Sequence, residues 1–117
     1  ATPEQMSFAH LTMHIAEGNY VFCSKIGGVA ALELPKLTES DGKDKLAARL
    51  KSSFEFCSTA LAKLDDSNMG EVLNLFGERK ASRAMAILML AGSWGDHYSL
   101  QATYLRMNGL LPPSAKK

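Results

Sequence analysis

The chain has few cysteines: two among 117 residues, and they are not a closely spaced pair. Cys23 and Cys57 each lie among apolar residues in a helical pattern. This is typical of reduced, buried thiols in a cytosolic protein. A nucleophilic thiol needs a nearby base or a helix N-terminus, which neither position offers. We therefore expect structural cysteines and a cytoplasmic location.

Other features are missing. No run approaches the ~20 apolar residues that span a bilayer, and no charged-then-apolar leader is present. With 13 basic and 12 acidic side chains, the chain has no excess of positive charge for nucleic acid. There is no glycine-rich phosphate loop and no nucleophile elbow. We expect a protein that binds neither membrane nor nucleic acid.

The residues that are present predict one helical domain over 1–117, since 46% of them are hydrophobic. Ser7 and Ser82 are suited to cap helices at their starts, and glycines mark the ends. Apolar residues recur at spacings of three and four. The predicted helices run from Ser7 to Gly27, from about Lys43 to Leu64, and from Ser82 to Asn108. Residues 29–43 should form a loop, and 72–77 a short extended segment or a turn.

Histidine is the most informative residue type. His10 and His14 lie four residues apart, on one face of the first helix. His97 lies on the apolar stripe of the last helix, where an unpaired polar side chain costs free energy. If the two helices pack together, three imidazoles can meet. Three imidazoles with an open fourth position form a known zinc arrangement.

Several segments give the chain a resemblance to a known family. Residues 7–17, with His10 and His14, and residues 97–109, followed by Pro112 and Pro113, resemble helices of the DinB/YfiT-like superfamily. The resemblance implies an all-α fold, a four-helix bundle. The chain starts where that bundle's second helix would begin, so we expect three long helices, with the N-terminal helix absent or replaced by a partner. The apolar stripe left uncovered predicts a homodimer.

The resemblance also implies a metal site, in which many members hold zinc or nickel with three histidines. By position, His14 matches the ligand of the second helix and His97 the second histidine of an HxxxH motif. The first histidine of that motif is replaced by Ser93, a poor ligand. His10 is the first candidate substitute, ahead of Asp96. Glu17, three residues after His14, is a candidate general base.

Two functions remain open. The first is a divalent-metal-dependent enzyme, either a hydrolase or a thiol-dependent transferase, acting on an unidentified small molecule; a thiol cofactor follows from the resemblance alone. The second is a degenerate, metal-free bundle that binds a small ligand or serves as an oligomeric scaffold. Fold alone does not decide between them.

Overall fold

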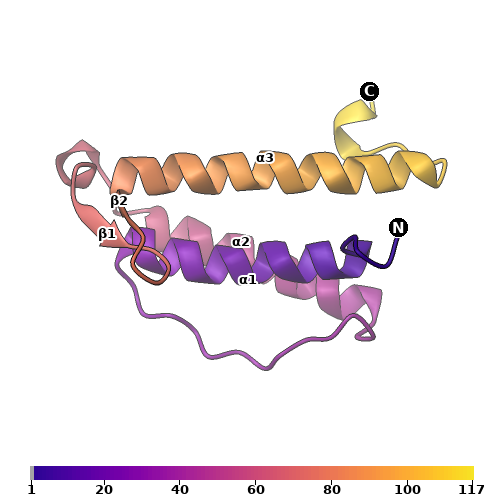
Figure 1. The fold of residues 1–117 in the computed structure, drawn as a ribbon, viewed down its shortest axis with the longest axis horizontal. Coiled ribbons are helices and arrows are strands. Elements are labelled where there is room, and N and C mark those ends of the chain that lie inside the picture. The colour runs from indigo at the N-terminus through magenta and orange to yellow at the C-terminus, as the bar shows by residue number, and fades with distance from the viewer. Residues whose placement is uncertain (1) are drawn as a thin grey trace.

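A computed structural model describes residues 2–117 and contains three long helices that run along one another (Figure 1). They are α1 (Phe8–Gly27), α2 (Lys43–Leu61) and α3 (Arg83–Met107). Two single-turn 3-10 helices, η1 (Asp66–Asn68) and η2 (Pro113–Ala115), follow α2 and α3. The predicted helical architecture is therefore confirmed in outline, although α2 ends three residues before the predicted Leu64.

The segment between α2 and α3 contains a small antiparallel hairpin. Strand β1 (Val72–Asn74) pairs with β2 (Lys80–Ser82), with Val72 opposite Ser82. The extended segment expected at 72–77 is thus present in part, but its partner strand was not predicted. The hairpin lies at one end of the helices and leads directly into α3 (Figure 1).

The helix ends follow the predicted capping chemistry. The Ser7 hydroxyl accepts a hydrogen bond from the backbone N–H of His10, and the Ser82 hydroxyl accepts one from Met85. Gly28 ends α1 with a positive φ of 65°, a conformation that costs glycine little. These local signals identify helix ends because they satisfy backbone groups that the helix itself leaves unpaired.

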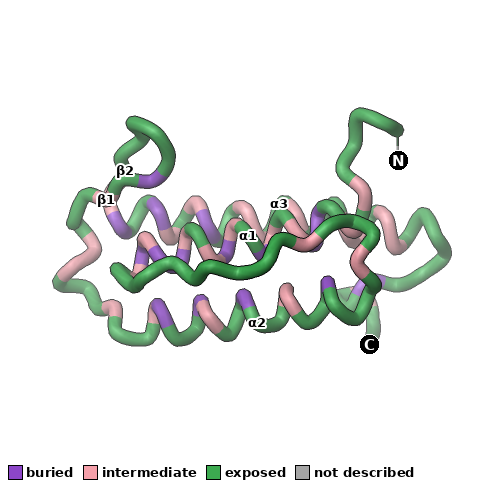
Figure 2. Tube along the Cα trace, turned by 90° about the horizontal axis from the view of Figure 1, so that it is seen from below, coloured by how far each residue is buried: buried purple, intermediate pink, exposed green. Residues whose placement is uncertain are grey.

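The core lies near the hairpin, where α1, α2 and the first part of α3 meet. The buried positions of α2 follow one edge of the helix, and the opposite edge is exposed (Figure 2). Some residues of the predicted apolar stripes are less buried than expected: Phe8, Val21 and Phe54 are all exposed. The buried cluster consists of Cys23, Ile26, Cys57, Ala60, Leu75, Ala86 and Leu90.

The expectation of reduced thiols was wrong, because Cys23 and Cys57 form a disulfide that joins α1 to α2. Their Cα atoms lie 5.1 Å apart across the core, within the distance that a disulfide spans. A separation of 34 residues gave no sign of this juxtaposition. The prediction of a cytoplasmic location was based on reduced thiols. Because disulfides persist mainly in oxidising compartments, the cysteines no longer favour that location.

A buried asparagine joins the three helices by hydrogen bonds. The Asn19 side chain on α1 is 1% exposed. Its amide nitrogen donates to the Ser53 hydroxyl on α2 at 3.0 Å, and its oxygen accepts from the Trp94 indole N–H on α3 at 2.6 Å. Because both ends of the amide are satisfied, the polar group stabilises one particular packing of the helices.

Within residues 2–117, none of the helices has an apolar stretch of the length needed to cross a membrane.

The C-terminal end of α1 comes very close to α2. A Cβ atom added at Gly27 would clash with the backbone carbonyl of Ala60, whereas one added at Gly92 on α3 would meet no atom within 4 Å. A side chain is therefore excluded by close contact at Gly27 but has free space at Gly92.

We predict that Gly27→Ala lowers the free energy of unfolding by about 1–3 kcal/mol, because the added methyl group forces the helices apart. The control Gly92→Ala should raise it by roughly 0.5–1 kcal/mol through lost backbone entropy of the unfolded chain. Urea denaturation measures both changes. Equal effects of the two substitutions would show that the close approach does not constrain the fold.

Candidate metal centre

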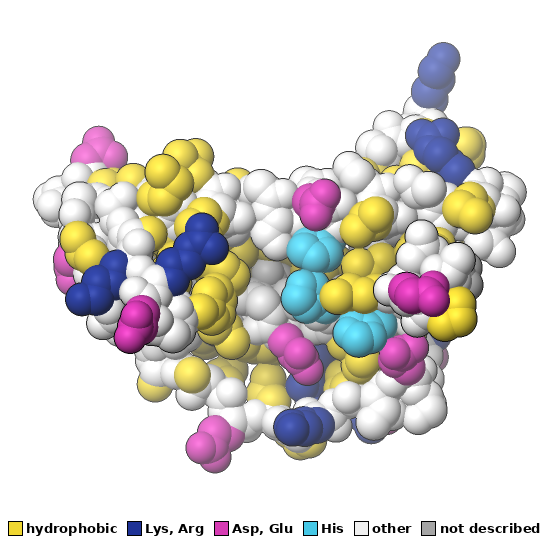
Figure 3. All heavy atoms as spheres, viewed as in Figure 1, with side chains coloured by type: hydrophobic (Ala, Val, Ile, Leu, Met, Phe, Trp, Pro, Cys, Tyr) yellow, Lys and Arg dark blue, Asp and Glu magenta, His cyan; other side chains and the backbone are white. Residues whose placement is uncertain are grey.

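The structure brings together His14 of α1 and His97 of α3. Their ring centroids lie 4.9 Å apart, with the ring planes inclined at 51°. The histidine side chains gather on one face of the molecule, over α1 and α3 (Figure 3). Two imidazoles from residues 83 positions apart therefore meet at the surface, where a small ligand can reach them.

The backbone fixes the hydrogen position on His97. Its Nδ1 lies 2.6 Å from the carbonyl oxygen of Ser93, one turn earlier on α3. A carbonyl oxygen only accepts, so in the neutral ring Nδ1 carries the hydrogen and donates it. The lone pair is then on Nε2, which is the arrangement found in metal-binding histidines whose other nitrogen is held by a carbonyl.

Ser93 lies beside the imidazole pair but on the Nδ1 side of His97. Its hydroxyl oxygen is 3.2 Å from that nitrogen. The hydroxyl therefore supports the orientation of His97 rather than extending the set of nitrogen donors. This agrees with serine being a poor ligand for zinc or nickel.

His10 has a partner of its own. Its Nδ1 lies 3.2 Å from Oε1 of Glu39, in the segment between α1 and α2. The Ser7 hydroxyl donates to the other carboxylate oxygen of Glu39 at 2.6 Å. His10 thereby connects the start of α1 to this segment. Nothing in the sequence pointed to Glu39 as its partner.

Among residues 2–117, no three or more His, Cys, Asp or Glu side chains are grouped so that they could hold a metal ion. Neither His10 nor Asp96 thus completes a three-ligand set with His14 and His97.

The separation of the two imidazoles is of the size that a shared metal ion requires, and it is also that of two packed rings. A ring centre lies about 3.2 Å from a zinc ion bound through a ring nitrogen, so two rings at a tetrahedral angle have centres about 5.2 Å apart. The observed 4.9 Å between His14 and His97 is close to that value. A metal ion at this place would have two nitrogen ligands, and its remaining positions would be open to water or to a bound molecule.

The environment favours the neutral form of His14. Partial burial lowers the pKa of its imidazole below 6.5, and the nearby rings of His97 and His10 lower it further; the Glu17 carboxylate acts in the opposite direction. A neutral imidazole is the form that binds metal ions.

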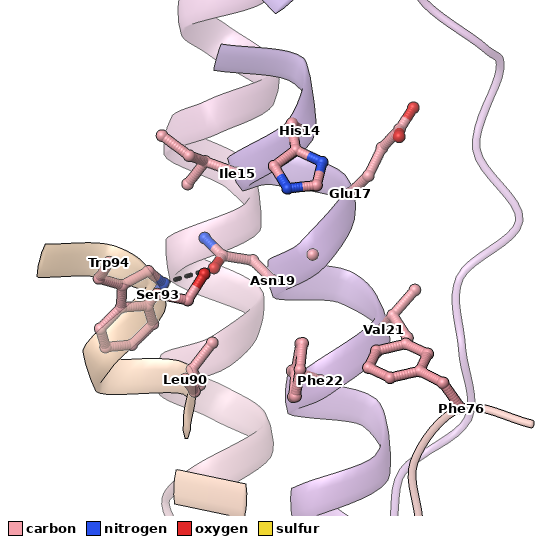
Figure 4. A pocket seen from close by; sticks show the side chains of 11 residues that line it. His14, Ile15, Glu17, Asn19, Val21, Phe22, Phe76, Leu90, Ser93 and Trp94 are labelled. Carbon is pink, nitrogen blue, oxygen red and sulfur yellow. Dashed lines mark hydrogen bonds between the residues drawn. The ribbon is translucent and has the colours of Figure 1, made fainter. Parts of the chain in front are cut away.

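A cavity of about 350 Å³ opens beside His14. Figure 4 shows His14, Ile15 and Glu17 toward one end, with the Glu17 carboxylate pointing away from the interior, and Ser93 between the two ends. Phe22 and Phe76 lie toward the other end. The sequence did not predict this cavity, because Phe76 reaches it from the segment between the two strands of the hairpin.

Comparisons of the chain with protein-family models, with curated proteins and with solved structures find no match. The DinB-like resemblance therefore stays a prediction.

The lowered pKa of His14 predicts how stability depends on pH. In metal-free protein the unfolded state takes up a proton at His14 near pH 6.5, before the folded state does. The stability that comes from the neutral ring is therefore present above that pH and is lost as the pH falls from there through the lowered pKa of the folded state.

We expect the free energy of unfolding of the metal-free wild type to fall more steeply below pH 6.5 than that of His14→Gln, which does not titrate. Denaturation in the presence of a chelator, repeated across this range, measures the difference. Parallel profiles for the two proteins would contradict the assignment.

Proposed function

We propose that the chain is a divalent-metal-dependent enzyme of the DinB-like type, with His14 and His97 as ligands for zinc or nickel. The observation that carries the proposal is the meeting of the two rings, 4.9 Å apart, with Nε2 of His97 free to bind. The lowered pKa of His14 supports it, since the ring need not lose a proton to bind.

The reaction class proposed is hydrolysis or thiol-dependent group transfer. A divalent ion, when bound, supplies Lewis acidity that lowers the pKa of a water or thiol. Glu17 lies one turn after His14 at the rim of the cavity, and its carboxylate, which points outward (Figure 4), would have to turn toward the bound ion to accept the released proton. The Ser93 carbonyl and hydroxyl hold the His97 ring, and the apolar walls of the cavity exclude water from the substrate.

A second candidate is a metal-free bundle that binds a small ligand. It is favoured by the absence, within residues 2–117, of any three-residue metal-binding group, and by the serine at the position of the third family ligand. In that case the hydrogen bonds of His97 stabilise α3 without taking part in chemistry.

Metal binding separates the two candidates. We expect untagged protein to bind one zinc or nickel ion per chain, and His14→Ala or His97→Ala to weaken binding at least about tenfold, because each removes one of two nitrogen ligands. His10→Ala is the control and should leave the affinity within about threefold. Calorimetric titration with each metal ion measures these values.

A gain-of-ligand variant makes this test sharper. Ser93→His adds a third imidazole one turn before His97 and should tighten binding at least about tenfold. If the wild type binds no metal and Ser93→His binds none either, the proposed metal site is wrong and the metal-free candidate is favoured.

We also propose that two copies of the chain associate through α3. Met85, Leu88, Leu100 and Met107 are exposed apolar residues that lie within about 120° of arc on this helix. Leu88, for example, is 66% exposed. Apolar side chains gathered on one helix face are typical of an association surface.

Sedimentation equilibrium at micromolar concentration should find a dimer for the wild type and a monomer for Leu88→Lys, since burying a lysine at the interface is costly. Leu110→Lys, an exposed position beyond the end of α3, is the matched control and should remain dimeric. A monomeric wild type would contradict the proposal.

A further inference from the structure

The cavity beside His14 is polar at one end only. Among its lining residues, Asn19 and Trp94 carry polar groups that are already used: the Asn19 amide bonds Ser53 and the Trp94 indole. These groups therefore have no free donor or acceptor for a ligand. The groups that retain hydrogen-bonding capacity toward a ligand are the His14 ring at one end and the Ser93 hydroxyl about halfway along, whereas the Glu17 carboxylate points away from the interior (Figure 4).

The rest of the lining is apolar. Val21 and Phe22 of α1, Leu90 of α3 and Phe76 border the end away from His14 (Figure 4). Phe22 and Phe76 meet edge to face, with ring centroids 5.0 Å apart. This end has no uncommitted donor or acceptor in its lining, so a hydroxyl group placed there would lose its hydrogen bonds to water without replacement.

We propose that the cavity receives a ring-sized apolar group of the substrate, whose reacting polar end lies beside His14 and Ser93. The volume of about 350 Å³ is within the range of small-molecule sites and has room for one such group. A sugar ring is disfavoured at this position, because several of its hydroxyl groups would face the apolar walls. It names the substrate class of the proposed enzyme and in that respect rests on the proposed function.

The position of Trp94 provides a direct readout. It is the chain's one tryptophan, and its side chain borders the cavity. Cyclohexylmethanol has an apolar ring and one hydroxyl and does not absorb where tryptophan does, so it is a suitable probe. Glucose is a ring-sized probe with a polar surface.

In the presence of a chelator, cyclohexylmethanol should change Trp94 fluorescence in a saturable way, and glucose should bind at least about tenfold more weakly. Glucose binding as tightly as cyclohexylmethanol, or no saturable change with cyclohexylmethanol, would overturn the proposal. Because the titration needs no metal, its failure leaves the metal site standing. Conversely, if His97→Ala abolishes metal binding, the cyclohexylmethanol titration still tests the cavity, because it is done without metal.

A variant that fills the cavity localises the binding. Gly18 lies on its wall, and a Cβ atom there would meet no atom within 4 Å. Gly18→Leu therefore occupies the cavity without a clash at Cβ and improves helix propensity. It should weaken cyclohexylmethanol binding at least about tenfold. Gly92→Leu, an equally open helical glycine outside the cavity, should not; equal binding by the two variants would place the ligand elsewhere.

Discussion

The hydrogen bond from the Trp94 indole to the Asn19 side chain is the interaction on which the site depends. It joins α3 to α1 at a buried point, and the same amide reaches Ser53 on α2. A shift of α3 by one turn would leave buried polar groups unpaired, at about 1–3 kcal/mol for each. The register of the helices is therefore fixed near the middle of the bundle.

The position of the histidines follows from that register. His97 comes three residues after Trp94, and His14 comes five residues before Asn19. With the helices held at Asn19, the two imidazoles meet about one turn farther along. The Ser93 carbonyl then sets the tautomer of His97. The candidate site thus combines a fixed pair of nitrogen donors with an adjacent cavity that is polar only beside them.

Local chemistry explains what the sequence could predict. The serine caps and the glycine ends of the helices are determined by nearby residues, and the structure has them where the sequence indicated. The spacing of the apolar residues placed His97 on the face of α3 that meets α1. These features need only the periodicity of a helix and the preferences of single residues.

The features that the sequence did not predict all depend on contacts between distant segments. The disulfide requires Cys23 and Cys57 to face each other across two helices, and the His10 contact requires the position of Glu39 in an irregular segment. The cavity requires Phe76 to fold back onto α1. Helical periodicity gives the face of each residue, but not which face of another helix lies opposite to it.

In the proposed site two imidazoles, and not three, hold a divalent ion. X-ray absorption spectroscopy of the zinc- or nickel-loaded protein measures the number of histidine ligands directly. We expect two imidazoles, completed by oxygen ligands from water. A spectrum with three imidazoles, or one with none, would contradict it.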